Sequence, residues 1–520
     1  MSEAKAGADA KAAFGLALGL AVIGALIDSG AIGWLLAPIV LMLSWFAMSR
    51  APLRSSLLVL TFFAFALENP SEMPAAGAWE SPFFSLGALM LQHLNRATGV
   101  GALFFSGMDV MLASLGVIAF MRRSTGRRDA VSTPKPMLKL AYVSLVGTVY
   151  VWLNGKIHGG DGGIALWQID RVIYLPLVFL LFQAALRGPD DYAALAKVVL
   201  GAACLRACQA MYVQSVIDLP PDPWTGPVLL PYATSHHDSM LFAWAAAILA
   251  AIFIQRAVKR PMRLVLLVGP ILLAGMYANQ RRMVWVQLLI VLFAMYVITP
   301  PNAIKRHLAR LLKIAAPFAL AYVVIGWGSY GGIFKPVQVI RSAVVSDVNA
   351  STQWRDVENV DLIHTIRTFP ILGTGYGHGF IELIPLPEVD YVLERFIPHN
   401  SILGLWAYCG YFGFTAMTLL WVAGVYFAVR GFHASEVPRE KAAALASFAA
   451  ILIYWVQCYG DMGLGSWTGV FMIAPALAAA GKLAVAAGAW TGAPAARRAA
   501  AAGPAVRASN PPRPSVHATP

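Results

Sequence analysis

The sequence predicts an all-α integral membrane protein with about 14 transmembrane helices (12–14) and one long, partly helical extracytoplasmic loop. Of the 520 residues, 58% are hydrophobic and only 12% are charged, whereas about 25% of the residues in soluble domains are charged. Apolar runs of about 20 residues, the length that crosses a bilayer, recur from Phe14 to Ala479. A chain of this composition has too few charged side chains to cover a water-soluble surface.

The predicted spans follow one another along most of the chain. Hydropathy places them at 14–28, 31–49, 55–68, 100–121, 138–153, 171–187, 193–215, 239–255, 262–279, 282–299, 311–328, 400–429, 442–458 and 465–481. This pattern divides the chain into an N-terminal transmembrane bundle (1–328), an extracytoplasmic catalytic loop (329–399), C-terminal transmembrane helices (400–485) and a disordered cytoplasmic tail rich in Ala, Pro and Arg (486–520).

Lysine and arginine predict the orientation, because cytoplasmic connections are enriched in both. With the N-terminus inside, the dense basic segments at 121–139, 255–263, 302–313 and 430–441 all lie in the cytoplasm, together with the C-terminus. Topology and anionic headgroups then account for most of the net charge of +13. Membrane lipid is therefore an expected partner, and nucleic acid is not.

Two arginines stand against this charge bias. Arg281 and Arg282 lie in YANQRRMVWVQL (277–288), in a short connection that the predicted topology places outside. One interpretation is an anion site, because guanidinium groups offer planar pairs of donors that match phosphate oxygens. The other is structural, with the side chains reaching lipid headgroups or pairing with a nearby carboxylate.

The predicted external loop at 329–399 mixes basic and acidic side chains, and a loop of this length is usually functional or disordered. Its segment VENVDLIHTIRTF (357–369) repeats apolar residues at helical spacing. The following ILGTGYGHGF (371–380) superficially suggests a phosphate-cradling loop, but it lacks the lysine and the strand-to-helix context that such a loop requires.

His399 and Asn400 lie where the chain re-enters the membrane, in ERFIPHNSILGLWAYCGYFGF (394–414). A histidine can stay neutral near pH 7 and accept a proton from a hydroxyl, which a lysine cannot do without a large change in pKa. The alternative is helix capping by Asn400 and Ser401, with His399 as a bystander.

Four segments together resemble the O-antigen ligase and polymerase family of bacterial membrane glycan transferases. They are PYATSHHDSMLFAWAAAIL, ANQRRMVWVQLL, the stretch from WRDVENVDLI to FPILGTGYGHGF, and PHNSILGLWAYCGYFG, within residues 225–430. Two departures stand out. Trp354 precedes Arg355, where the family has an aromatic residue after the arginine, and His236 and His237 occupy a place where the family more often shows asparagine.

The resemblance implies transfer or polymerisation of a polyprenyl-diphosphate-linked glycan in O-antigen or exopolysaccharide biosynthesis. The reaction would take place at the extracytoplasmic face of the bacterial inner membrane, with a glycan or lipid A-core as the acceptor. Because the leaving group is a lipid diphosphate, catalysis needs cations near the developing negative charge, and arginines can supply them without a metal or cofactor.

On this interpretation Arg282 and Arg355 are catalytic and face the diphosphate, and His399 is the base that removes a proton from the acceptor hydroxyl. The resemblance and the residue types also suggest a set of substrate-binding residues. These are Arg281, Arg367, Asn400, His237 and Arg206.

Two charges, Asp109 and Arg206, fall inside predicted spans, where an isolated charge is costly. One expectation is that they pair with each other, most simply in a structural role. Otherwise Arg206 faces the diphosphate of the donor, or the pair marks a proton route.

Two other functions stay open at this point. A secondary transporter would be favoured by paired half-molecule repeats with broken helices near the midplane, and we find no such pairing. A non-catalytic component of a polysaccharide export assembly would be favoured if the predicted site tolerated substitution. Within the transferase class, ligation, polymerisation and protein glycosylation share one donor chemistry; the lack of an evident protein-binding module favours the first two.

Overall fold

The computed structural model describes seven long segments of the chain and a few isolated positions between them and near the N-terminus. The segments are 30–67, 83–100, 103–124, 133–218, 234–329, 350–386 and 395–490. The predicted span at 14–28, the tail beyond 490 and much of the predicted loop outside 350–386 lie outside the described segments. Within those segments every regular element is a helix.

A helix lies at each predicted span from the second onward. These helices are α2 (Gly30–Arg50), α3 (Leu53–Ala66), α6 (Gly107–Ser124), α7 (Lys135–Ile157), α9 (Tyr174–Ala185), α10 (Pro189–Val216), α11 (Asp238–Gln255), α12 (Pro261–Asn279), α13 (Arg282–Ile298), α14 (Ala303–Gly326), α17 (Ser401–Ala434), α18 (Pro438–Gly460) and α19 (Trp467–Ala486). Further helices lie in the connections: α4 (Phe84–Leu91), α5 (Leu94–Thr98), α8 (Gly162–Ile169), η2 (Gly332–Phe334), α16 (Ala350–Thr368) and η4 (Gly463–Gly465).

In the described part of the chain, 9 helical segments are long and apolar enough to cross a membrane. One of them joins α8 and α9, and four shorter apolar helices, in α2, α3, α6 and α13, lie among the others. The protein is therefore a helical membrane protein.

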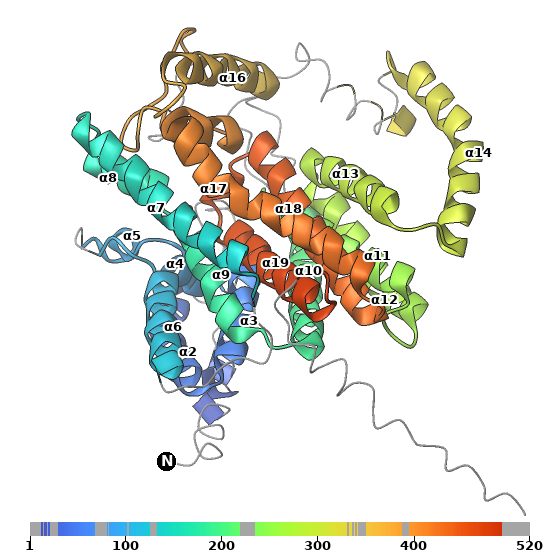
Figure 1. The fold of residues 1–520 in the computed structure, drawn as a ribbon, viewed down its shortest axis with the longest axis horizontal. Coiled ribbons are helices and arrows are strands. Elements are labelled where there is room, and N and C mark those ends of the chain that lie inside the picture. Colours follow the sequence, from blue (N-terminus) through green and yellow to red (C-terminus); the bar gives the residue numbers. More distant parts are fainter. Residues whose placement is uncertain are drawn as a thin grey trace, which may run out of the picture.

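α19 is the central helix of the bundle. It packs against α17, α18, α9 and α3 (Figure 1), and its side chains are almost all buried. Its sequence includes the run APALAAAG, and small residues of this kind let neighbouring helices approach closely without a driving force from water.

α14 differs from its prediction at its start. The basic segment at 302–313, expected as a cytoplasmic connection, forms the first turns of this helix, because the side chain of Asn302 caps it by accepting from the Lys305 backbone N–H at 2.7 Å. The helix lies at the edge of the molecule (Figure 1), and none of its apolar span is buried within the protein. The apolar composition of α14 therefore suits contact with lipid.

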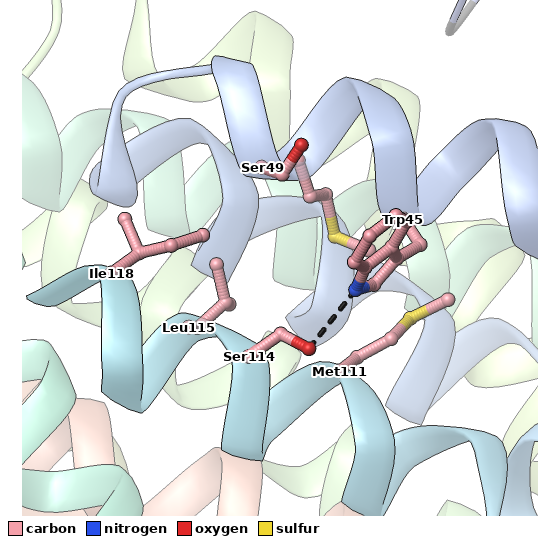
Figure 2. Close-up of a pocket in the computed structure, with 7 residues that line it drawn as sticks. Trp45, Ser49, Met111, Ser114, Leu115 and Ile118 are labelled. Carbon is pink, nitrogen blue, oxygen red and sulfur yellow. Dashed lines mark hydrogen bonds between the residues drawn. The ribbon is translucent and has the colours of Figure 1, made fainter.

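α2 and α6 pack side by side around a small depression lined by five apolar side chains and two serines (Figure 2). The indole Nε1 of Trp45 donates a hydrogen bond of 2.9 Å to Ser114 Oγ across the two helices. No titratable side chain lines this depression, so it serves helix packing and offers no group for chemistry.

The glycine-rich segment after α16 is clamped between α7 and α17. Gly375, with φ of +80°, lies so close to Gly155 that an added Cβ would be 2.3 Å from its backbone nitrogen. Gly375 N–H donates to the Tyr408 carbonyl at 2.9 Å, and the Gly377 carbonyl accepts from Asp161 N–H at 3.0 Å. Gly377 N–H donates to Gln168 Oε1 at 2.6 Å. The amides of Gly375 and Gly377 are thus bonded to protein acceptors, so the segment positions α16 and is not built to cradle a phosphate.

The clamp predicts different costs for two alanine substitutions. In Gly375→Ala the new side chain must adopt a left-handed backbone angle and also clashes with the Gly155 backbone. In Gly159→Ala the backbone angle is similar, +86°, but no atom lies within 4 Å of the new Cβ. We expect Gly159→Ala to cost about 1 kcal/mol and Gly375→Ala roughly 1–3 kcal/mol more. Thermal unfolding of the detergent-solubilised variants measures this difference, and equal midpoints would contradict the clamp.

Candidate functional site

Several helix ends meet on one side of the bundle. α11, α13, α17 and α19 begin there, and α12 and α18 end there. The side chain of Met283, at the start of α13, packs on Gly460, where an added Cβ would lie 2.0 Å from Met283 Cε. Ser401 Oγ donates to the Asp461 carbonyl at 3.3 Å. α16 reaches the same place, since Arg355 Nη1 donates to the Gly460 carbonyl at 3.0 Å.

Asp461 lies at the centre of this cluster, directly after α18. Its side chain is largely buried, and Oδ2 lies 3.0 Å from Nδ1 of His236. Burial raises the pKa of Asp461, but His236, followed by Arg355 and His399, outweighs burial and brings the pKa well below its usual range. The carboxylate is therefore ionised and is shared by groups from separate segments.

His236 faces this carboxylate from the segment before α11. Its side chain is 38% exposed. Burial, followed by the charge of Arg281, lowers the pKa of His236, and the opposing effect of Asp461 is smaller. The imidazole is therefore neutral near pH 7.

His399 belongs to a second pair of histidine and carboxylate. The carboxylate of Glu358, from α16, is fully buried and lies 3.3 Å from His399 Nδ1. Both oxygens of Glu358 also accept from the His399 backbone N–H, each at 3.1 Å, and the ring of Trp354 packs edge-on at 4.7 Å between centroids. In the tautomer in which Nδ1 donates to Glu358, Nε2 is the acceptor nitrogen, as a general base requires.

Arginines from two segments lie near these pairs, since the charge of Arg281 acts on His236 and that of Arg355 acts on Asp461. Arg281 occupies the N-cap position of α13 without a capping hydrogen bond from its side chain, and Arg282 is the first residue of the helix. Both immediately precede Met283, which contacts Gly460. The Nε atom of Arg355 is buried and has no hydrogen-bond partner among the described residues. Together with the positive end of the α13 dipole, these groups bring positive charge to a site that also holds two carboxylates.

Three of the predicted binding residues have different surroundings from one another. Arg367 is exposed and lies 12 residues after Arg355 on α16, about 18 Å along the helix. Asn400 caps α17, because Oδ1 accepts from Leu403 N–H at 3.1 Å. The His237 ring is buried, with Nε2 3.3 Å from the Met462 carbonyl.

The prediction that Asp109 and Arg206 pair with each other is wrong. Arg206 forms two hydrogen bonds with Asp238 at the start of α11, Nε to Oδ1 at 3.0 Å and Nη2 to Oδ2 at 2.7 Å, and both side chains are buried. Asp109 lies in the first turn of α6 and not in the middle of a span, and its Oδ2 accepts from the Ser106 hydroxyl at 2.9 Å and from the Ser106 backbone N–H.

Sequence reasoning missed the roles of two carboxylates, Glu358 and Asp461. Glu358 was one of several acidic residues in a mixed loop. Asp461 is the single acidic residue in the connection between α18 and α19. Its place in a connection that the predicted topology puts outside was the only signal in the sequence that could have marked it as a site residue. In the segments that the structure describes, no three His, Cys, Asp or Glu side chains are grouped so that they could hold a metal.

The fold and this cluster define a class: a helical membrane protein with a cationic site, holding two histidine–carboxylate pairs, at one end of its bundle. No known protein family has a sequence model that matches the chain, and no curated protein matches it.

The pair of Arg206 and Asp238 predicts a test of whether Arg206 binds substrate. Arg206→Met leaves a buried carboxylate alone and is expected to lower stability by about 3–5 kcal/mol, whereas the double variant Arg206→Met, Asp238→Leu loses much less. Thermal unfolding and function are measured on both variants. A stable double variant that is inactive would assign Arg206 a role in binding, and an active one would show that the pair is structural.

Proposed function

We propose that the protein transfers or polymerises a polyprenyl-diphosphate-linked glycan, in the manner of the O-antigen ligase and polymerase family that its sequence resembles. The observation that carries this proposal is the meeting of Arg355, the start of α13 with its two arginines, and the pair of His399 and Glu358 at one end of the bundle. Cations suit a diphosphate, and a histidine fixed by a buried carboxylate suits a hydroxyl nucleophile.

In the proposed reaction Arg281, Arg282 and Arg355 bind the diphosphate of the donor. The acceptor hydroxyl oxygen attacks the anomeric carbon of the donor glycan, and its proton passes to Nε2 of His399. The bond from that carbon to the phosphate oxygen breaks, and its electron pair remains on the diphosphate. The arginines stabilise this charge as it develops, which is where preorganised electrostatics contributes most.

Glu358 is a positioning residue in this scheme. Its carboxylate holds the His399 ring through Nδ1 at 3.3 Å and stabilises the imidazolium that forms when Nε2 accepts the proton. Because Glu358 is on α16, three residues after Arg355, one helix orients both the base and an anion-binding cation.

We propose the predicted topology for the whole chain: about 14 spans, both termini in the cytoplasm of a bacterium, and residues 329–399 outside. The acceptor is then a glycan or a lipid A-core. In a Cys208→Ser background, a membrane-impermeant maleimide should label Asp356→Cys on intact spheroplasts and label Lys259→Cys only after lysis; both positions are exposed. The opposite labelling would overturn the orientation.

The site predicts which variants lose glycan transfer in a deletion strain. Arg355→Ala should lower transfer by roughly 10²-fold or more and His399→Ala by roughly 10²–10⁴-fold. Arg367→Ala is the matched control, since it removes the same side chain from an exposed position on the same helix. The measurement is a profile of surface glycan and of lipid-linked precursor, with membrane expression checked for each variant.

Loss of long or surface-linked glycan, with accumulation of lipid-linked units, is the expected result for the two site variants alone. Accumulated single repeat units would indicate a polymerase, and accumulated long lipid-linked chains a ligase. Normal glycan in both site variants would refute the proposed site.

A further inference from the structure

We infer that His236, held by Asp461, is a second acid–base group of this site, which takes up a proton when a diphosphate binds and donates it to the departing diphosphate. This inference rests on the proposed function and deepens it. It concerns a residue in one of the two departures from the family that the sequence resembles, so the resemblance does not supply it.

The first observation is a rigid partner for the imidazole. Oδ2 of Asp461 lies 3.0 Å from His236 Nδ1, while Oδ1 accepts from the Met462 backbone N–H at 2.9 Å. The Asp461 backbone is fixed in turn, with its N–H bonded to the Gln457 carbonyl and its carbonyl to the Gly463 N–H, both at 2.7 Å. The carboxylate therefore orients the ring and stabilises its protonated form.

The second observation is that both histidines belong to one electrostatic cluster. His236 precedes α11 and His399 precedes α17, so the two histidines come from separate segments. Both nevertheless lower the pKa of Asp461. Nδ1 of each ring lies within 3.3 Å of a buried carboxylate oxygen, and each side chain is partly exposed, 38% for His236 and 26% for His399. A displacement needs one group to take a proton and benefits from another that gives one, and this site holds both.

The third observation is the set of charges that face His236. Arg281, from the start of α13, holds its pKa below the ordinary value, and His237 acts weakly in the same direction. Arg355, from α16, and His399 face the shared carboxylate. A bound diphosphate would offset these cations and add negative charge, which raises the pKa of His236 and favours its protonation.

The proton balance of the reaction then closes. The acceptor hydroxyl loses its proton to His399 as the new glycosidic bond forms. The bond between the anomeric carbon and the phosphate oxygen breaks with its electron pair on oxygen, and His236 gives that oxygen its Nε2 proton. His236 is left neutral and His399 protonated, and exchange with water restores both.

Calorimetric titration of the full-length protein in nanodiscs with undecaprenyl diphosphate tests the inference, in two buffers of different ionisation enthalpy at pH 7.5. Wild type should take up a substantial fraction of a proton on binding. His236→Asn, or His236→Gln if the first variant fails to fold, should still bind and lose this uptake. His364→Asn, which changes a histidine of α16 outside the cluster, should keep it.

The outcomes separate the two claims. Binding with no proton uptake in wild type, or with unchanged uptake in the His236 variants, would overturn the acid–base role and leave the proposed transferase intact. No binding of the diphosphate by wild type would overturn the proposed function itself. In transfer assays, the wild-type rate should fall as the pH rises and His236 loses its proton, and His236→Asn should lower the rate by roughly 10²-fold and remove this fall.

Discussion

A buried carboxylate must be paired, and Asp461 and Glu358 meet this requirement by drawing separate segments together. Asp461 binds His236 from before α11 and faces Arg355 from α16. Glu358 fixes the backbone and ring of His399 before α17. If either charge were removed, the helix ends around it would lose the interaction that sets their spacing, so the site and the local fold depend on the same two groups.

α16 carries most of this arrangement, and it is fixed from both sides. Its buried face continues from Glu358 to Asp361, whose Oδ1 accepts from the backbone N–H groups of Leu383 and Ile384 at 2.9 and 3.0 Å. The glycine clamp that follows the helix ties it to α7 and α17. A helix held in this way can present Arg355 and Glu358 at fixed positions, which preorganised electrostatic catalysis requires.

The sequence predicts most of the fold because a membrane span is a local property of composition. It could not predict pairings between helices: Arg206 bonds to Asp238, a residue at the edge of a predicted span, and a hydropathy profile contains nothing about that contact. Helical spacing alone could not show which of Arg355 and Arg367 lies at the site, because the turn of α16 that faces the site depends on the packing of the whole helix. Asp461 has no neighbouring motif, and only the fold shows its position among the cations.

The most direct test of the central claim is transfer by the purified protein in proteoliposomes, supplied with a polyprenyl-diphosphate-linked glycan and a glycan or lipid A-core acceptor. The proposed mechanism predicts a new glycosidic product and an equal amount of released polyprenyl diphosphate, both lost in Arg355→Ala. Donor that crosses the bilayer unchanged, or product formed equally by Arg355→Ala, would contradict it.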